Sequence, residues 1–397
     1  MTDFTATRAR FAIPEGVIYL DGNSLGPPTV DAAARVASMM TDEWGALLIR
    51  GWNEAGWMDA PALVGDRIAR LIGAAPGSVT VGDTLSLRVW QALAAALDLM
   101  PERRVILTDD GNFPSDIYMA EGLARLKSQG HCVRIVAPEA VEDAIDDTVA
   151  VLMLTEVDYR TGRLHDMARL TAKAHAAGAL TVWDLAHSAG AIAVDVGGAG
   201  ADFAVGCTYK YLNGGPGAPA FSYLGPHMVG RARNPLQGWL GHAAPFAFAP
   251  DYAPAPGVAG MRIGTPPVIA LEALATALDV WDGVDLQDLR ARSIALSQAF
   301  IAGVEALDAG LTLAAPRVPE ARGSQVSFRH PQAYAICRAL IARGVIGDFR
   351  MPDVLRFGFA PLYVSPDDVA RAVEILGEIM HSGAWDRPEF HARAAVT

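Results

Sequence analysis

The chain has 397 residues, 51% of them hydrophobic, and its 44 acidic residues outnumber its 32 basic ones to give a formal net charge of −12. This balance argues against a nucleic-acid partner, since no basic patch stands out, and no apolar run approaches the roughly 18 residues of a membrane span. The three cysteines lie far apart without metal-ligand spacing, and the N-terminal segment lacks a secretory signal, so we expect a cytoplasmic, globular protein with free, buried thiols and no metal site.

The middle of the chain has the pattern of an α/β protein. From about residue 60 to residue 225, short β-rich apolar runs alternate with helical segments, which is typical of a mostly parallel sheet with helices on both faces. The segment 167–178 has the periodicity of an amphipathic helix that ends at Gly178. We expect strands at 104–109, 131–137, 149–157, 179–184 and 202–208.

The C-terminal part of the sequence indicates a smaller α+β domain. A Pro- and Ala-rich loop at 243–257 is followed by helices from Pro267 through Leu307. A helix at 332–343 is then surrounded by short apolar runs within 324–330, 344–350 and 354–360. We therefore expect a large domain at 51–275 and a small α+β domain made of 1–50 and 276–397.

Ligands of open α/β sheets bind beyond the carboxyl ends of the strands, so the polar residues that follow apolar runs are the candidates. Thr84 and Ser86 stand at a helix start, where free N–H groups and the helix dipole can hold a phosphate, although they can equally be capping residues. Phe113 and Asp116 lie in the turn after the strand 104–109, which is also compatible with an ordinary turn and an N-terminal acid.

Two further strands end in residues that suit covalent chemistry. Asp184 ends a wholly apolar strand and His187 follows it, and a carboxylate there needs a cationic or hydrogen-bonding partner, unless it caps a helix. The next strand delivers Tyr209 and Lys210 to the same edge. Most lysines are solvated surface charges, but a partly buried lysine amine can capture an aldehyde as a Schiff base.

Together these features match the needs of pyridoxal phosphate. That cofactor requires a lysine for its aldehyde, a carboxylate for its pyridine nitrogen, an aromatic face for its ring and a helix N-terminus for its phosphate. No other common cofactor requires all four.

Seven segments, taken in order, resemble the kynureninase family of fold-type-I pyridoxal-phosphate enzymes, in the aspartate aminotransferase superfamily. Each segment alone is weak, but the ordered set is specific and runs nearly the whole length of the chain. The segments are YLDGNSLG (19–26), FPSD (113–116), DLAHSAG (184–190), YKYLNGGPG (209–217), GWLGH (238–242), MRIGTPP (261–267) and LRFGFAPLY (355–363).

This resemblance implies a homodimer with active sites at the subunit interface. It implies hydrolytic cleavage of the Cβ–Cγ bond of L-kynurenine, or of 3-hydroxy-L-kynurenine, within tryptophan catabolism. The products are anthranilate, or 3-hydroxyanthranilate, and L-alanine.

The resemblance also implies roles for individual residues. Lys210 bonds to the cofactor and moves protons at the substrate Cα, Asp184 keeps the pyridine nitrogen protonated, and Tyr209 binds the phosphate and takes part in proton transfer. The resemblance implies further cofactor contacts from Leu85, Ser86, Phe113, Asp116, Thr155, His187, Trp239 and Thr265. Among them, Phe113 is the stacking aromatic residue, and Trp239 and Thr265 come from the other subunit.

Arg356 resembles the arginine that grips the substrate α-carboxylate, and a guanidinium fork fits a carboxylate through two hydrogen bonds. A surface ion pair is the alternative for this arginine. The other residues expected to bind substrate are Asn23, Ser24, Trp52 and Asn53.

Two positions depart from the family pattern. Trp52 or Asn53 occupies the place where some members carry a histidine near the substrate ring, and Arg88 replaces an expected asparagine. These departures leave open the preference between kynurenine and its 3-hydroxy form. We expect Trp52, Trp57 and Trp239 to supply flat walls for the anthraniloyl ring of the substrate, with core packing as the alternative for each of them.

Two other functions are alternatives for this sequence. A cysteine desulfurase or selenocysteine lyase needs a catalytic cysteine in a mobile loop, whereas Cys337 falls within an expected helix. A catalytically silent regulator that only binds the cofactor is the second alternative, and the presence of Lys210, Asp184 and Arg356 counts against it.

Overall fold

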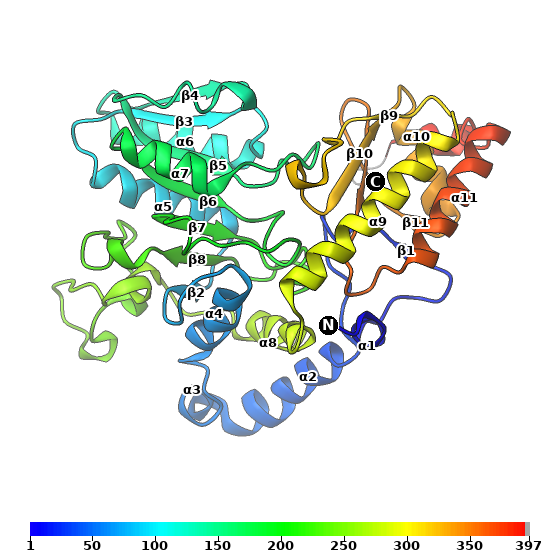
Figure 1. Ribbon diagram of the computed structural model, residues 1–397. Coiled ribbons are helices and arrows are strands. Elements are labelled where there is room, and N and C mark those ends of the chain that lie inside the picture. Colours follow the sequence, from blue (N-terminus) through cyan, green and yellow to red (C-terminus); the bar gives the residue numbers. More distant parts are fainter. Residues whose placement is uncertain (394–397) are drawn as a thin grey trace.

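The computed structural model describes residues 1–393, and its main feature is a seven-stranded sheet (Figure 1). The strand order is β2-β8-β7-β6-β5-β3-β4, in which neighbours from β7 to β4 pair in parallel and β8 is antiparallel to both of its neighbours. The strands are β2 Val79–Val81, β3 Val105–Asp109, β4 Cys132–Val136, β5 Val149–Thr155, β6 Leu180–Asp184, β7 Phe203–Gly206 and β8 Phe221–Leu224.

The mostly parallel sheet and its five expected strands are confirmed as β3 to β7. The short strands β2 and β8, of three and four residues, had no place in the sequence prediction. Every residue of β5 is buried, as a strand in the middle of a parallel sheet requires.

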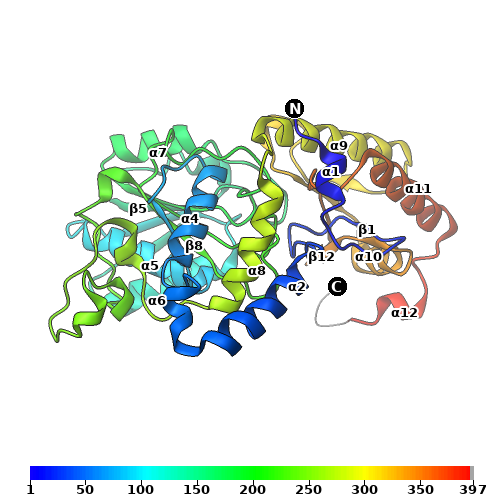
Figure 2. The same ribbon diagram turned by 90° about the horizontal axis from the view of Figure 1, so that it is seen from below.

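Helices cover both faces of this sheet, as expected from the sequence. Alternate residues of each strand face opposite sides, so Ile106 packs in one hydrophobic cluster and Leu107 in the other. Figure 2 shows β5 between α7 and α5. The covering helices are α4 Ala60–Leu71, α5 Leu85–Asp98, α6 Pro114–Lys127, α7 Met167–Ala176 and α8 Val268–Leu278.

The boundaries of α7 follow from local chemistry. The Asp166 carboxylate accepts a hydrogen bond from the Arg169 backbone N–H at 3.0 Å and so caps the helix start. The helix stops before Gly178, whose φ of 78° lies in the left-handed region that favours glycine. The expected helix end at Gly178 is thereby confirmed.

The C-terminal part contains a four-stranded antiparallel sheet in the order β12-β13-β10-β9. Its strands are β9 Thr312–Leu313, β10 Gln325–Arg329, β12 Asp348–Arg350 and β13 Val354–Gly358, and β1 Ile18–Tyr19 pairs in parallel with β11 Val345–Ile346 beside it. The remaining helices are α1 Phe4–Arg8, α2 Ala32–Ser38, α3 Gly51–Glu54, α9 Leu286–Ala306, α10 Ala333–Ala342, α11 Pro366–Ser382 and α12 Pro388–His391. The domain boundaries at 51 and 276 stay a prediction.

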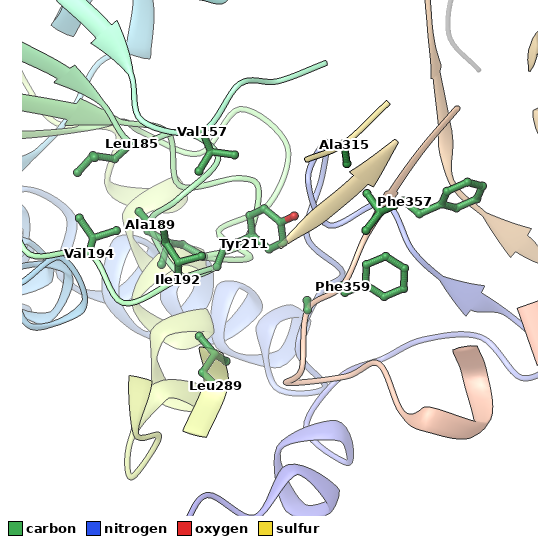
Figure 3. Packing of buried hydrophobic residues seen from close by; sticks show 14 of the residues in the cluster. Val157, Leu185, Ala189, Ile192, Val194, Tyr211, Leu289, Ala315, Phe357 and Phe359 are labelled. Carbon is green, nitrogen blue, oxygen red and sulfur yellow. The ribbon is translucent and has the colours of Figure 1, made fainter. Parts of the chain in front are cut away.

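One hydrophobic cluster is continuous between the two parts of the molecule. In Figure 3, Tyr211 lies between Ile192, which belongs to the part of the molecule with the large sheet, and Phe359, which follows β13. Because Tyr211 is buried there, the neighbouring Lys210 is held at the junction of the two parts.

Among residues 1–393, no helix is both long and apolar enough to cross a membrane. All three cysteines are free, but the expectation that all are buried is wrong for Cys132, which is exposed because β4 is an edge strand.

Candidate active site

The site is organised around an acid and an amine at the carboxyl edge of the large sheet. Asp184 is the last residue of β6, and Lys210 follows the neighbouring parallel strand β7. The buried Asp184 accepts a hydrogen bond from the backbone N–H of Ala186 at 2.8 Å. Burial raises the pKa of Asp184, and the nearby Lys210 cation opposes that rise.

His187 contacts the amine directly. Its Nε2 lies 2.8 Å from Nζ of Lys210, while its buried Nδ1 has no hydrogen-bond partner among residues 1–393. Burial, and then the Lys210 charge, hold the pKa of His187 well below its ordinary value. Lys210 Nζ also lies 5.9 Å from the ring centroid of Phe113 and 5.8 Å from that of Tyr209.

A second buried acid, Asp116, interacts with Asp184. Asp116, in the first turn of α6, is fully buried, and its Oδ2 has no hydrogen-bond partner in the described part of the chain. Burial, followed by the Asp184 charge, raises the pKa of Asp116 well above its ordinary value. Of the two carboxyls, Asp116 is therefore the one shifted further toward its protonated form, whereas the Lys210 cation favours the ionised form of Asp184.

The N-termini of α5 and α6 lie together at one end of the site. Ser86 Oγ is 2.9 Å from Ser115 Oγ, and Thr84 makes no capping hydrogen bond with its side chain. The first N–H groups of Leu85 and Ser86 have no partner within their helix, and the helix dipole makes this end attractive to an anion. The geometry suits a phosphate, as the sequence prediction for Leu85 and Ser86 requires.

Arg88 does not point into that end of the site. Its buried guanidinium donates hydrogen bonds to the backbone oxygens of Gly82 at 2.9 Å and Met261 at 2.7 Å. Arg88 thereby ties the start of α5 to the segment that leads to Thr265, an exposed residue that lines a small cavity together with Asp83.

At the other end of the site, Arg356 of β13 is only 1% exposed. It donates hydrogen bonds to Asp348 Oδ1 at 2.6 Å and to Ser24 Oγ at 3.0 Å, and a further one to the backbone oxygen of Tyr159. The alternative of a surface ion pair is thus wrong, because the pair is buried. Tyr159 packs edge-on against Phe113 with 5.1 Å between ring centroids, which connects this arginine to the Lys210 region.

Asp348 and Arg350 were not singled out from the sequence. Both lie on β12, and Asp348 is opposite Arg356 in the strand register. The sequence does contain a signal for these two residues. Asp348 and Arg350 are two positions apart in DFR (348–350), and residues two apart on a strand face the same side of the sheet.

Two more of the expected site residues, Thr155 and Asn23, are buried. Thr155 is paired with Asp184 in the β5–β6 register, and its Oγ1 donates to the Val157 backbone oxygen at 3.3 Å. Asn23 is fully buried, and neither the oxygen nor the nitrogen of its side-chain amide has a hydrogen-bond partner within the residues that the structure describes.

The side chains expected near the substrate ring make no contact with the amine among the described residues. Among the described residues, no hydrogen bond, ion pair or ring contact joins Trp52, Asn53 or Trp239 to Lys210. Trp52 packs edge-on against Trp57 at 5.7 Å, and the exposed Trp239 against Phe246 at 5.8 Å. Core packing accounts for Trp57, which is 6% exposed.

The residues present fit pyridoxal phosphate. An amine, a buried acid, an aromatic face and two helix N-termini converge, and Asp116 Oδ2 and His187 Nδ1 are buried polar atoms without partners. Within residues 1–393, no three His, Cys, Asp or Glu side chains are grouped so as to bind a metal ion.

The fold is shared with solved structures of cysteine desulfurases. The apo structure of the cysteine desulfurase from Thermococcus onnurineus NA1 superposes with a TM-score of 0.79 over 96% of this chain and 99% of that one, at 17% identity. The cysteine desulfurase CsdA from Escherichia coli gives a TM-score of 0.78 over the same shares, also at 17% identity. Fold and site therefore define a fold-type-I pyridoxal-phosphate enzyme.

Sequence similarity identifies the family within this class of enzymes. Kynureninase from Pseudomonas fluorescens is 51% identical over 98% of this chain and 95% of that protein, and kynureninase from Burkholderia pseudomallei (strain 1106a) is 50% identical over the same shares. The family described as Kynureninase C-terminal domain matches residues 289–376. The chain belongs to the kynureninase family.

Proposed function

We propose that this protein is a pyridoxal-phosphate-dependent hydrolase that cleaves the Cβ–Cγ bond of L-kynurenine to anthranilate and L-alanine, as one step of tryptophan catabolism. The observation that carries the proposal is the convergence of Lys210, Asp184 and His187 at one sheet edge in a chain that is 51% identical to a kynureninase. When bound, pyridoxal phosphate supplies an electron sink for the charge that develops at Cα and Cβ of the substrate.

Lys210 is the residue that we propose to bond to the cofactor and to move the proton at Cα. Its Nζ has the neutral His187 imidazole as neighbour, at 2.8 Å, so a hydrogen-bond acceptor is already in place for the amine. The Lys210 cation favours the ionised form of the buried Asp184, and an Asp184 carboxylate would stabilise a protonated pyridine nitrogen.

Tyr209 is suited to donate a proton. Burial raises the pKa of its hydroxyl, so the proton is retained at neutral pH. Cleavage between Cβ and Cγ consumes one water at the ketone carbon, and Cβ must gain a proton to become the methyl group of L-alanine. A protonated Tyr209, or Lys210, can supply it.

Substrate orientation is assigned to Arg356 with Ser24 and Asn23, at the opposite end from the helix N-termini. A fixed carboxylate holds the Cα–H bond in one direction relative to Lys210, which is worth a large part of the barrier in well-oriented reactions. The buried setting of Arg356 strengthens its hold on an anion.

We also propose a homodimer, with Trp52, Asn53, Trp239 and Thr265 completing the site of the partner subunit. The support is that Trp239 and its ring neighbour Phe246 are exposed, as is Phe248, so a large aromatic surface is uncovered in the single chain. The proposed domains are 51–275 and 1–50 with 276–397, and the proposed location is the cytoplasm, where free thiols persist.

The test is a turnover assay with L-kynurenine that follows the fluorescence of released anthranilate. We expect activity, and a comparison with 3-hydroxy-L-kynurenine fixes the ring preference. Arg356→Ala is expected to raise KM strongly, because the carboxylate loses its cation. Turnover of cysteine alone, to alanine and sulfur, would establish the desulfurase function in its place.

The placement of the cysteines argues against a desulfurase. Cys337 is buried inside α10, with its Sγ 3.6 Å from the Gly347 backbone oxygen. Cys132 is exposed but lies on β4, and three strands separate it from β7. Cys207 is buried, and burial raises the pKa of its thiol. Neither buried thiol is on a free loop, and the exposed one is remote from Lys210.

A further inference from the structure

The guanidinium of Arg356 is almost saturated by the protein itself. Its Nε and Nη2 donate to the two carboxylate oxygens of Asp348, its Nη1 donates to the backbone oxygen of Tyr159, and Nη2 also donates to Ser24 Oγ. A guanidinium has five N–H groups, so these four hydrogen bonds leave a single N–H, on Nη1. One N–H cannot hold both oxygens of a substrate carboxylate.

Arg350 has donors to spare at the same place. Its Nη2 lies 2.9 Å from Asp348 Oδ2 and 3.2 Å from Ser24 Oγ, and its Nη1 donates to the Phe349 backbone oxygen at 2.9 Å. Nε–H and one N–H of Nη1 keep no partner among the described residues. The Arg350 side chain is 34% exposed, whereas that of Arg356 is 1% exposed, so a ligand can reach it.

The charges also favour an anion at this point. Asp348 is a single carboxylate shared between two arginines, and burial opposes its ionisation but Arg356 and Arg350 hold its pKa below the ordinary value. Asp348, Arg350 and Arg356 together therefore carry one net positive charge. Both arginines also lower the pKa of His187, which places them within electrostatic range of the residue that contacts Lys210.

We infer that Arg350 is a second binding residue for the substrate α-carboxylate, which it holds together with the one free N–H of Arg356. Asp348 and Ser24, which touch both arginines, fix the distance between the two guanidiniums. This inference rests on the proposed function. It assigns the selectivity for a free α-carboxylate to a pair of arginines on adjacent strands β12 and β13.

The test uses the holoenzyme and the variants Arg350→Gln and Arg350→Lys. Arg329→Gln is the matched control, because Arg329 lies on β10 in an exposed ion pair with Asp353 at 2.8 Å and does not contact Arg356. Two quantities are measured: kcat and KM for L-kynurenine, and the affinities for L-alanine and L-alaninamide read from the absorbance of the bound cofactor. The two amino compounds differ only in the carboxylate.

Arg350→Gln is expected to raise KM about tenfold or more, the usual loss for a hydrogen bond to a charged group, with a much smaller change in kcat. The preference for L-alanine over L-alaninamide should fall by a similar factor, with partial recovery in Arg350→Lys and wild-type values in Arg329→Gln. A KM within twofold of wild type, or equal losses for L-alanine and L-alaninamide, would overturn the inference. If the wild-type enzyme does not cleave L-kynurenine, the proposed function fails, and the two affinities still decide the role of Arg350.

Discussion

Lys210 Nζ lies 2.8 Å from His187 Nε2, and this contact decides which ring nitrogen of the histidine carries the proton. Burial and the lysine charge both lower the pKa of His187, so the imidazole is neutral at physiological pH. Since Nε2 faces the donor Nζ, the ring proton belongs on Nδ1, and that buried nitrogen has no partner within the described residues. A ligand with an acceptor at this place would satisfy it.

The lysine content gives a direct test of the covalent residue, because the sequence holds only three lysines: Lys127, Lys173 and Lys210. The purified protein is expected to be yellow, and borohydride reduction followed by peptide mass analysis should place the cofactor on Lys210. Lys210→Ala should abolish the label.

Lys127→Ala is the control for this experiment, since Lys127 is engaged with Asp98 at 2.6 Å on the surface. It should keep the colour and the labelled peptide of the wild type. A Lys210→Ala protein that is labelled at Lys127 or Lys173 would contradict the assignment.

The two buried acids should respond differently to the same change. Asp184→Asn removes the charge opposite Lys210 while keeping the shape, and we expect kcat to fall about 100-fold or more, as for other electrostatic groups. Asp116→Asn replaces the carboxyl whose pKa burial and the Asp184 charge raise further, which favours its neutral form, so the loss should be less than about tenfold. Steady-state kinetics at saturating cofactor measure both, and equal losses would show that the proton is not on Asp116.

Much of the fold was predictable because its signal is local. The strands β3 to β7 are apolar runs of four to seven residues between turn signals, and Asp184 and Lys210 stand directly after two of them. Parallel strands bring their carboxyl ends to one edge, so the convergence of acid and amine followed from the strand order.

The rest depends on contacts between segments far apart in the chain. Ser24 and Arg356 are separated by 332 positions, yet they share Asp348 as a partner, and nothing local announces that arrangement. Cys132 has the sequence context of a buried strand residue, and only the strand order reveals that β4 is an edge. Residues that a second subunit would contribute cannot be placed from one chain's periodicity.

Asp21 gives a pH dependence to the carboxylate end of the site. Burial, and then the Asp348 charge, raise the pKa of Asp21 to about 8, so it is neutral at pH 7 and becomes an anion as the pH rises. That second negative charge near Arg356 should weaken binding of the substrate carboxylate. We therefore expect KM for L-kynurenine to rise between about pH 7 and about pH 9 in the wild type.

Asp21→Asn is the comparison, because it keeps a polar side chain that cannot ionise. The ratio of wild-type KM to variant KM should increase with pH, and titration of the substrate itself cancels in this ratio. A ratio that is constant from about pH 7 to about pH 9 would show that Asp21 does not titrate in this range.

Glu156 should make the folded state sensitive to pH. It is buried, its Oε2 has no partner, and it lines a cavity of about 630 Å³ with His165 and Arg163. Burial raises the pKa of Glu156 to about 7, above its ordinary value of 4.5. A carboxyl whose pKa is higher in the folded state stabilises the fold below the unfolded value, and this contribution is lost as the pH rises through about 7.

Glu156→Gln cannot ionise, so its stability should lack this pH-dependent loss. Relative to the variant, the wild-type free energy of unfolding should fall by on the order of 3 kcal/mol between about pH 4.5 and about pH 8, measured by denaturant titration. Glu139→Gln, at an exposed carboxylate of the same cavity, should follow the wild type throughout. Parallel curves for wild type and Glu156→Gln would mean that the cavity hydrates the carboxylate, because only water or a cation at Oε2 can remove the cost of burying its charge.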